Sequence, residues 1–357
     1  MGKYKHFIIV AVLVVLTTLG LKFLVFGPMF QLPVQASEQG VSIDTMFEGH
    51  FWMISFLFAL IMVLVFYSAV VFRRKPGDET DGPHVHGNTA LEIIWTVVPV
   101  FAVVGFGIWG GVTLKQLLSP VPDEMTIKVT GRQWAWSFQY PEYEDINSAE
   151  LVLLKDQPVV LELSSSDVLH SFWVPEFRVK QDAVPGRTTT LRITPTMAGE
   201  YKVRCAEICG FDHANMLAPV RVLEQAEFTA WADERMNAPK FGEMTPEERG
   251  ALWYSNEGFA CEGCHTIDGT AATAPSWLSV YGRSEQLTDG TTVTVDDAYI
   301  RQSILDPQSQ IVAGFEAVQM PADFGDQFSA KQAEIAATEG VEIDIINDII
   351  AYMQTLK

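Results

Sequence analysis

Two long runs without a formal charge constrain this chain more than any other feature. Residues 51–72 and 93–114 each span 22 residues, and about 20 apolar residues are enough to cross the hydrocarbon core of a bilayer. They predict a transmembrane helical hairpin within residues 49–115. The alternative is a pair of buried core helices in a soluble protein, but uninterrupted runs of this length argue against it.

The segment between the two runs orients the hairpin. It begins with the basic cluster Arg73-Arg74-Lys75 and continues through the turn-rich residues 76–88. Basic residues beside membrane spans stay on the cytoplasmic side. The hairpin loop is therefore expected inside, and everything from residue 116 onward outside.

A third apolar run, residues 7–26, follows Lys3 and Lys5 and is interrupted by Lys22. Residues 1–48 are predicted to be a signal peptide, with a small-residue cleavage site at residues 34–36, or an extra N-terminal helix followed by a short outer segment. Both alternatives give the same topology for the rest of the chain.

Glu92 lies at the cytoplasmic start of the second run. A carboxyl group at membrane depth is costly and is a functional candidate. A carboxylate at a helix N-terminus that faces water is instead favoured by the helix dipole. The residue pattern alone leaves both interpretations open.

The formal charge of −20 is placed unevenly. Residues 1–115 hold seven basic and seven acidic groups, so all of the net charge falls in residues 116–357. This balance argues against a nucleic-acid-binding protein, and 48% hydrophobic residues argue against disorder. The acidic part would steer a cationic partner toward the protein; the alternative is that it serves solubility alone.

Residues 116–224 change to short β-type runs separated by Gly and Pro. Many short strands with regular turns are typical of an all-β sandwich or barrel of about 100 residues. The predicted strands are residues 125–129, 134–138, 158–163, 188–193, 200–205 and 218–223.

A set of metal-ligand side chains lies within this predicted β domain. Cys205, Cys209, His213 and Met216 fall within 12 residues, and His170 precedes Cys205 by 35. Sulfur with imidazole selects copper or zinc, and the thioether favours copper. The alternative, a disulfide between the two cysteines, leaves the other three residues unexplained.

A second redox motif follows. Residues 225–244 are predicted to be a linker with no strong hydrophobic period, and Thr245-Pro246-Glu247-Glu248 has the pattern of a helix start. The sequence Cys261-Glu262-Gly263-Cys264-His265 is typical of covalent c-type haem attachment. A redox dithiol and half a zinc site are the alternatives, but no later cysteine pair completes a zinc site.

Such a haem needs a sixth ligand. Met320 is predicted for this role, because Met353 has the apolar spacing of a buried helix position. A Met ligand opposite His265 raises the potential of a haem, as suits electron transfer.

The copper motif C-A-E-I-C-G-F-D-H-A-N-M, with D-V-L-H-S-F-W-V-P and G-R-Q-W-A-W, resembles subunit II of cytochrome c oxidase over about residues 45–224. The resemblance implies a cupredoxin-like domain with a binuclear copper (CuA) centre. It implies that Cys205 and Cys209 bridge the coppers and that Glu207 ligates through its main-chain carbonyl. His170, His213 and Met216 complete the ligand set.

The same resemblance assigns two further residues. Trp134 resembles the tryptophan through which electrons enter, exposed at the face where the donor docks; a core aromatic is the alternative. Ala135 follows it, where many relatives carry an aromatic residue, which puts the detail of the aromatic pathway in doubt. Glu92 resembles the carboxylate at the mouth of a proton channel in the partner subunit.

Residues 245–357 resemble a class I cytochrome c domain, which implies that Pro275 lies against the proximal His265. The whole chain thus resembles subunit II of a caa-type oxidase, with a fold class of membrane α-helical hairpin, all-β cupredoxin-like sandwich and all-α class I cytochrome c. The resemblance implies that electrons pass through haem c and CuA to haem a and the oxygen-reducing site in subunit I, with proton translocation by the complex.

The implied partners are subunits I and III, membrane lipid, and a donor such as a cytochrome c or an upstream respiratory complex; nucleic acid is not among them. The implied location is the plasma membrane of a bacterium, with the C-terminal domains on the outer face. Two alternatives remain: the CuA subunit of a nitric oxide reductase, and a membrane-anchored copper chaperone.

Overall fold

The computed structural model describes residues 2–82, 84, 86–317 and 320–357. By contacts between Cα atoms the chain divides into two compact units. The first comprises residues 1–122 with 175–179, and the second comprises residues 123–174 with 180–357.

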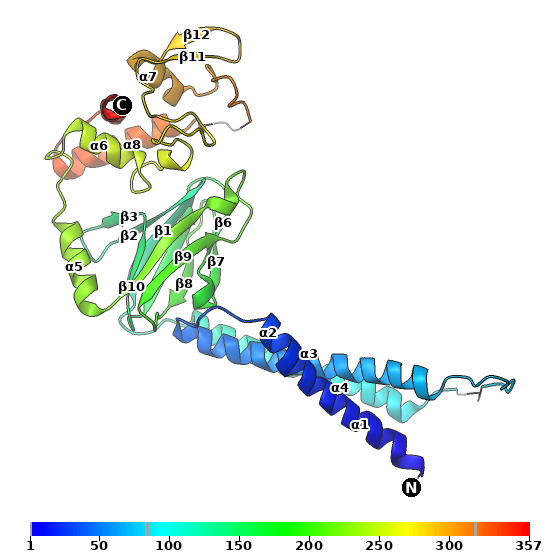
Figure 1. Cartoon of the computed structure of the whole chain (residues 1–357). Coiled ribbons are helices and arrows are strands. Elements are labelled where there is room, and N and C mark those ends of the chain that lie inside the picture. Colours follow the sequence, from blue (N-terminus) through cyan, green and yellow to red (C-terminus); the bar gives the residue numbers. More distant parts are fainter. Residues whose placement is uncertain (1, 83, 85, 318–319) are drawn as a thin grey trace. The chain divides into compact units, whose positions relative to one another are not determined.

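Long helices build the first unit (Figure 1). Helix α1 (Gly2–Gly20) continues through a π-helical turn (Leu21–Phe26) into α2 (Gly27–Met29), and α3 (Glu38–Val71) and α4 (Thr89–Leu118) follow. Among the described residues, three helical stretches are long and apolar enough to cross a membrane: Tyr4–Met29, Glu38–Val71 and Thr89–Leu118. The prediction of two long apolar helices is confirmed, and their arrangement as a transmembrane hairpin stays a prediction. The choice between a signal peptide and an extra helix for residues 1–48 stays a prediction.

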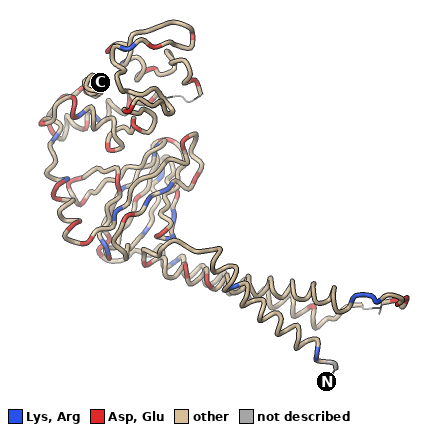
Figure 2. Tube along the Cα trace, in the orientation of Figure 1, with Lys and Arg blue, Asp and Glu red and all other residues tan. Residues whose placement is uncertain are grey.

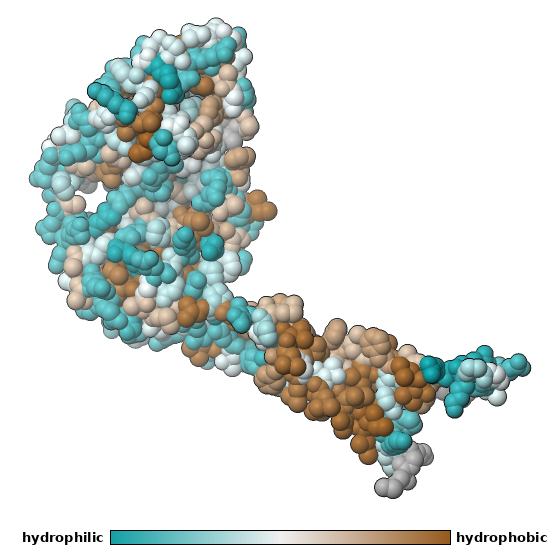
Figure 3. All heavy atoms as spheres, viewed as in Figure 1, coloured by the Kyte–Doolittle hydropathy of each residue, from teal (hydrophilic) through white to brown (hydrophobic). Residues whose placement is uncertain are grey.

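The surface of these helices fits a hydrocarbon environment. Figure 3 shows hydrophobic residues covering most of the helices in that view, and large apolar side chains of α4 such as Ile94, Trp95 and Phe101 are exposed. Figure 2 shows few charges along the helices and a basic stretch where the connection between α3 and α4 begins. A soluble fold would bury these apolar side chains, so the helices require lipid or a protein partner.

Polar contacts hold residues 175–179 against the start of α3 in the same unit. Arg178 Nε donates to Asp44 Oδ1 at 2.7 Å, and Ser37 Oγ donates to the Phe177 carbonyl at 2.9 Å. Ser37 also caps α3 by accepting a hydrogen bond from Gly40 N. Residues 175–179 lie in sequence between two strands of the β-sandwich, but they belong to the first unit.

Two five-stranded sheets form a β-sandwich in the second unit (Figure 1), so the predicted all-β domain is confirmed. The first sheet has the order β3-β2-β1-β5-β8 and the second the order β4-β10-β9-β6-β7. Strands β1/β5 and β4/β10 pair in parallel and the other neighbours are antiparallel. The strands are β1 (Met125–Arg132), β2 (Ala135–Tyr140), β3 (Ile146–Ser148), β4 (Leu151–Leu154), β5 (Val159–Ser165), β6 (His170–Trp173), β7 (Lys180–Ala183), β8 (Thr189–Ile193), β9 (Gly199–Cys205) and β10 (Leu217–Leu223).

The sandwich core comes from alternation along the strands. In β5 every second residue is buried, as the period of two predicts for a strand with one face inward. Ile127, Phe138, Leu161 and Phe172 are fully buried. Phe172 on β6 lies opposite Cys205 on β9, so the strand pairing places His170 beside the copper motif.

The segment predicted to be a linker, residues 225–244, contains a helix, because α5 (Gln225–Met236) begins directly after β10. Phe228 and Trp231 are buried three residues apart, the spacing of one helix face. Trp231 packs edge-on against Tyr140 of β2, with 5.0 Å between ring centroids. The helix is therefore part of the packing of the sandwich.

The rest of the unit is mostly helical, with α6 (Pro246–Tyr254), α7 (Asp297–Leu305), α8 (Phe324–Glu339) and α9 (Ile345–Thr355). The expectation of an all-α domain is wrong in one detail, because β11 (Ser284–Gln286) and β12 (Thr292–Thr294) form a hairpin. Helices α6 and α9 are joined by a buried ion pair in which Arg249 Nη2 lies 2.8 Å from Asp348 Oδ1. The predicted cap of α6 by Thr245 is confirmed.

Candidate functional site

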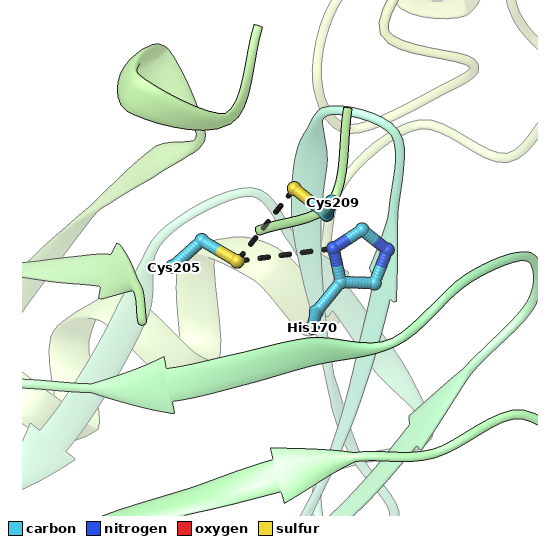
Figure 4. Close-up of side chains that lie close together, drawn as sticks. All are labelled: His170, Cys205 and Cys209. Atoms are coloured by element: carbon cyan, nitrogen blue, oxygen red, sulfur yellow. Dashed lines mark hydrogen bonds between the residues drawn. The ribbon is translucent and has the colours of Figure 1, made fainter. Parts of the chain in front are cut away.

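Three potential metal ligands meet at one edge of the sandwich. His170 begins β6, Cys205 ends β9, and Cys209 lies in the connection to β10 (Figure 4). Cys205 Sγ is 3.9 Å from His170 Nδ1 and 3.8 Å from Cys209 Sγ. A disulfide needs about 2.05 Å between its sulfurs, so the two cysteines are free thiols here.

The other predicted ligands extend this cluster. Cys209 Sγ lies 3.5 Å from His213 Nδ1 and 3.7 Å from Met216 Sδ, and the Glu207 carbonyl oxygen lies 3.2 Å from Cys205 Sγ. Each cysteine sulfur therefore has an imidazole nitrogen and one further potential ligand beside it. Two soft thiolates with this set of neighbours suit copper ions that share both sulfurs.

The electrostatics of the cluster favour a negative charge on Cys205. Burial raises the pKa of this thiol, but hydrogen bonds with His170, with backbone groups of Glu207 and Ser171 and with Cys209 together outweigh burial and lower the pKa to about 6. Burial, reinforced by the charge of Cys205, raises the pKa of Cys209 to about 12. A second thiolate therefore needs a cation beside it, as a bound metal supplies.

The second nitrogen of His170 is already occupied. His170 Nε2 lies 2.8 Å from Asp167 Oδ1, so it carries the proton and donates it to the carboxylate. In the neutral imidazole the lone pair then lies on Nδ1, the nitrogen that faces Cys205. The fold thereby selects the imidazole tautomer that can bind metal through Nδ1.

Trp134 differs from its prediction in one respect. It was expected to be exposed, but it is partly buried, and its indole Nε1 is buried without a hydrogen-bond partner in the described structure. The ring packs over Gly210, where an added Cβ would lie 3.2 Å from Trp134 Cζ2 and where φ is +121°. Glycine at this position lets the metal-binding loop approach the tryptophan closely.

Glu92 lies in the first turn of α4 and is exposed. Its Oε1 accepts a hydrogen bond from Asn88 N at 3.1 Å, and the Asn88 side chain accepts one from Leu91 N. These contacts satisfy free N–H groups of a helix start, and they match the interfacial interpretation of Glu92. Its role at a proton channel stays a prediction.

The Cys-x-x-Cys-His motif borders a cavity in the C-terminal part of the unit. Cys261, Cys264 and His265 line it together with apolar side chains such as Ile304, Phe324 and Ile349. Desolvation raises the pKa of Cys261 to about 12, and burial also raises that of Cys264. A redox dithiol needs a lowered thiol pKa, so the environment argues against that alternative.

His265 has one ring nitrogen bonded within the protein and the other available for a metal. Its Nδ1 donates to the Pro275 carbonyl at 2.9 Å, which leaves Nε2 free to ligate. Burial lowers the pKa of His265 and so favours the neutral imidazole that a metal requires. Pro275 thus lies against His265, in agreement with the position that the resemblance implies.

Two methionines line the same cavity. Met320 is partly buried and packs at the edge of the hydrophobic core, whereas Met353 on α9 is 6% exposed and belongs to that core. The assignment of Met320 as sixth ligand stays a prediction, and Met353 is its one rival by position among the described residues.

A membrane-anchored β-sandwich with two thiols, two imidazoles and a thioether at one edge is a cupredoxin-like protein with a site for a copper pair. Comparisons with known proteins agree. Residues 27–110 match the family model of the transmembrane domain of cytochrome c oxidase subunit II, and residues 147–223 match the model of its periplasmic domain.

Proteins named as subunit 2 of cytochrome c oxidase are similar to this chain over more than half of its length. Cytochrome c oxidase subunit 2 of Alkalihalophilus pseudofirmus is 32% identical over 72% of this chain and 79% of its own. The Synechocystis protein of the same name is 31% identical over 58% and 76%. The periplasmic domain of subunit II from Bradyrhizobium japonicum is 31% identical over 32% of this chain and 95% of its own, with a TM-score of 0.31.

The chain therefore belongs to the cytochrome c oxidase subunit II family and is part of a haem-copper terminal oxidase. Membership of this family implies a CuA copper centre, and the cluster of His170, Cys205 and Cys209 provides ligand atoms that could hold a metal.

Sequence reasoning missed two residues beside this cluster, Asp167 and Gln133. Both lie in motifs that the sequence had marked, D-V-L-H and G-R-Q-W. Their contacts depend on which loops meet in the fold, and no spacing in the sequence reports that.

Proposed function

We propose that this chain carries two electron carriers, a covalent haem c and a binuclear CuA centre, and receives electrons for a caa-type cytochrome c oxidase. Electrons would enter at the haem, continue to CuA and leave for haem a in subunit I, where oxygen is reduced. The single observation that carries the copper part of the proposal is the gathering of two thiols, two imidazoles and a thioether at one edge of a subunit II sandwich.

The proposed copper ligands follow from the distances. Cys205 and Cys209 would hold the copper pair together with His170, His213, Met216 and the Glu207 carbonyl, which all lie beside one of the two sulfurs. When bound, the copper pair supplies one-electron chemistry with the charge spread over two ions. The protein's own contribution is to hold the ligands in place before the electron arrives.

The proposed haem site rests on the C-terminal cavity. Cys261 and Cys264 would form thioethers to the haem, and His265 would ligate the iron while its hydrogen bond to Pro275 fixes the ring. The haem supplies a second one-electron carrier on the same chain. Because the haem would be on the same chain as the copper, its effective concentration at the copper site would be set by the segment that joins the two domains.

The proposed partners follow from the surfaces. The exposed apolar faces of α3 and α4 would contact subunits I and III and lipid. The acidic outer domains would attract a basic donor such as a cytochrome c. The basic cluster at residues 73–75 would keep the α3–α4 connection cytoplasmic in a bacterial plasma membrane, with residues 116–357 outside.

Replacing Met320 with Leu should leave the haem attached, because attachment uses the two cysteines, and should lower its midpoint potential, because a thioether ligand raises that potential. The measurement is a redox titration of the haem absorbance in the purified full chain. Met353→Leu is the matched control, since Met353 lines the same cavity from the core. If Met353→Leu lowers the potential and Met320→Leu does not, Met353 is the ligand.

Glu92→Gln should slow oxygen consumption severalfold without loss of copper, if Glu92 passes protons toward the channel of subunit I. The control is Glu79→Gln, an exposed carboxylate in the connection that precedes α4. Turnover and proton uptake are measured in the assembled oxidase in vesicles. Normal turnover with coupled proton uptake would leave Glu92 as a cap of α4 only.

The order of carriers can be tested by injecting one electron from a photoreductant into the assembled oxidase. We expect the haem c absorbance to change first and the CuA band to follow at the rate at which haem c is reoxidised. Reduction of CuA at full yield with no change at haem c would contradict the proposed route.

A further inference from the structure

Asp167 occupies the loop between β5 and β6, three residues before His170. Its two carboxylate oxygens have different partners. Oδ1 accepts hydrogen bonds from His170 Nε2 at 2.8 Å and from Val168 N at 2.6 Å. Oδ2 accepts one from the backbone N of Gln133 at 2.6 Å. One carboxylate thus joins a proposed copper ligand to the turn that carries Trp134.

Gln133 continues the connection. Its side-chain Nε2 donates to the carbonyl of Cys209 at 2.6 Å. The neighbouring Gly210 also lies close to it, since a Cβ there would come within 2.8 Å of the same Nε2. The β1–β2 turn is therefore bonded to the metal-binding loop as well as to Asp167.

Together these hydrogen bonds close a ring outside the metal ligands. The ring runs from His170 through Asp167 and Gln133 to Cys209. The contacts of Cys205 Sγ with Cys209 Sγ and with His170 Nδ1 close it across the site. The ring joins three loops that are far apart in the sequence. His170 is fully buried, whereas 27% of the Asp167 side chain is exposed, so the ring ends at the protein surface.

We propose that Asp167 and Gln133 are positioning residues for electron transfer. Asp167 fixes the tautomer and the ring plane of His170, and Gln133 holds Trp134 and the Cys209 loop in register with that imidazole. The inference rests on the proposed copper ligands. A carboxylate bonded to a ligating imidazole makes the imidazole a stronger donor to metal, so Asp167 stabilises the oxidised copper pair.

Asp167→Asn is the first test, because an amide has nearly the same shape and only one accepting oxygen. We expect two coppers per chain, a raised midpoint potential of the copper centre, and exchange of the His170 Nε2 proton accelerated at least about tenfold, since a hydrogen bond to a charged group contributes about 1.5–3 kcal/mol. The probe is the purified full chain loaded with copper, studied by redox titration and by nuclear magnetic resonance of the histidine protons.

Asp182→Asn is the matched control. Asp182 Oδ1 accepts a hydrogen bond from Ser171 Oγ at 2.8 Å, so this variant removes a carboxylate beside the residue next to His170 without touching the ring. In this variant the midpoint potential of the copper centre should move less than in Asp167→Asn, and the His170 Nε2 proton should exchange as in the wild type. Equal shifts of the midpoint potential in both variants would mean that Asp167 acts only through its charge, and would overturn the inference.

Gln133→Leu tests the other half of the ring. It keeps the backbone N–H that binds Asp167 and removes the amide that binds Cys209. We expect an unchanged copper count and potential, with slower reduction of the copper centre by an external donor. An unchanged rate would overturn the role of Gln133, and an unchanged potential and proton exchange in Asp167→Asn would overturn that of Asp167. A wild-type chain without copper would instead refute the proposed function.

Discussion

Cys209→Ser is expected to reduce the copper content from two ions per chain to at most one and to abolish the signal of an electron shared between two coppers. Cys209 Sγ lies within 3.8 Å of Cys205 Sγ, His213 Nδ1 and Met216 Sδ, so it links the two halves of the cluster. A serine oxygen is a hard ligand and does not replace a soft bridging thiolate. The measurement is copper per chain together with the electron paramagnetic resonance spectrum of the full chain.

The control for this prediction lies on the same loop. Ile208 is adjacent to Cys209, and its side chain is 83% exposed. Ile208→Ser should therefore retain both coppers and the shared-electron signal. A Cys209→Ser protein that keeps two coppers with the wild-type spectrum would refute the bridging role of Cys209.

Gly250→Ala is expected to unfold much of the C-terminal part of the chain and to prevent haem attachment. Gly250 lies on α6 where it crosses α9, and an added Cβ would come within 2.1 Å of the Asp348 carbonyl oxygen and 2.6 Å of Tyr352 Cβ. The first of these atoms is backbone, so the helices must separate. Replacing glycine with alanine inside a helix usually stabilises a protein by roughly 0.5–1 kcal/mol. At Gly250 we expect the opposite, a loss of stability.

Separation of the helices would also damage the buried ion pair. Asp348 is 2% exposed and receives hydrogen bonds from Arg249 and from Trp253 Nε1. Breaking a buried pair costs about 3–5 kcal/mol, and overpacking a core costs about 1–3 kcal/mol. Either loss is a large part of the roughly 5–15 kcal/mol that stabilises a typical domain.

Limited proteolysis and haem content per chain measure this effect. Glu247→Ala is the control, because Glu247 is exposed in the first turn of the same helix. It should resist protease and carry haem as the wild type does. Wild-type protease resistance and haem content in Gly250→Ala would show that the crossing of α6 and α9 is looser than the distances indicate.

Much of the site could be predicted because its residues are close in sequence. Cys205, Cys209, His213 and Met216 fall on one short loop, where ligand spacing is local information. His170 is 35 residues away, and only the pairing of β6 with β9 brings it beside Cys205. The family motif supplied that long-range contact, which hydrophobic periodicity does not report.

The incorrect predictions depended on tertiary contacts. Trp134 is partly buried and packs beside Gly210 of the metal-binding loop, and sequence does not report which loops meet. The buried face of α5 is only three turns long and lies in a charged segment, so its periodicity was weak. The β11–β12 hairpin did leave a local signal, Asp289-Gly290 between its two strands.

The most direct test of the account is a count of cofactors in the full chain purified from membranes after maturation with copper and haem. We predict two coppers that share one unpaired electron, and one haem that stays with the polypeptide under denaturing conditions. One loosely bound copper and no covalent haem would contradict the two-carrier account and favour a copper chaperone.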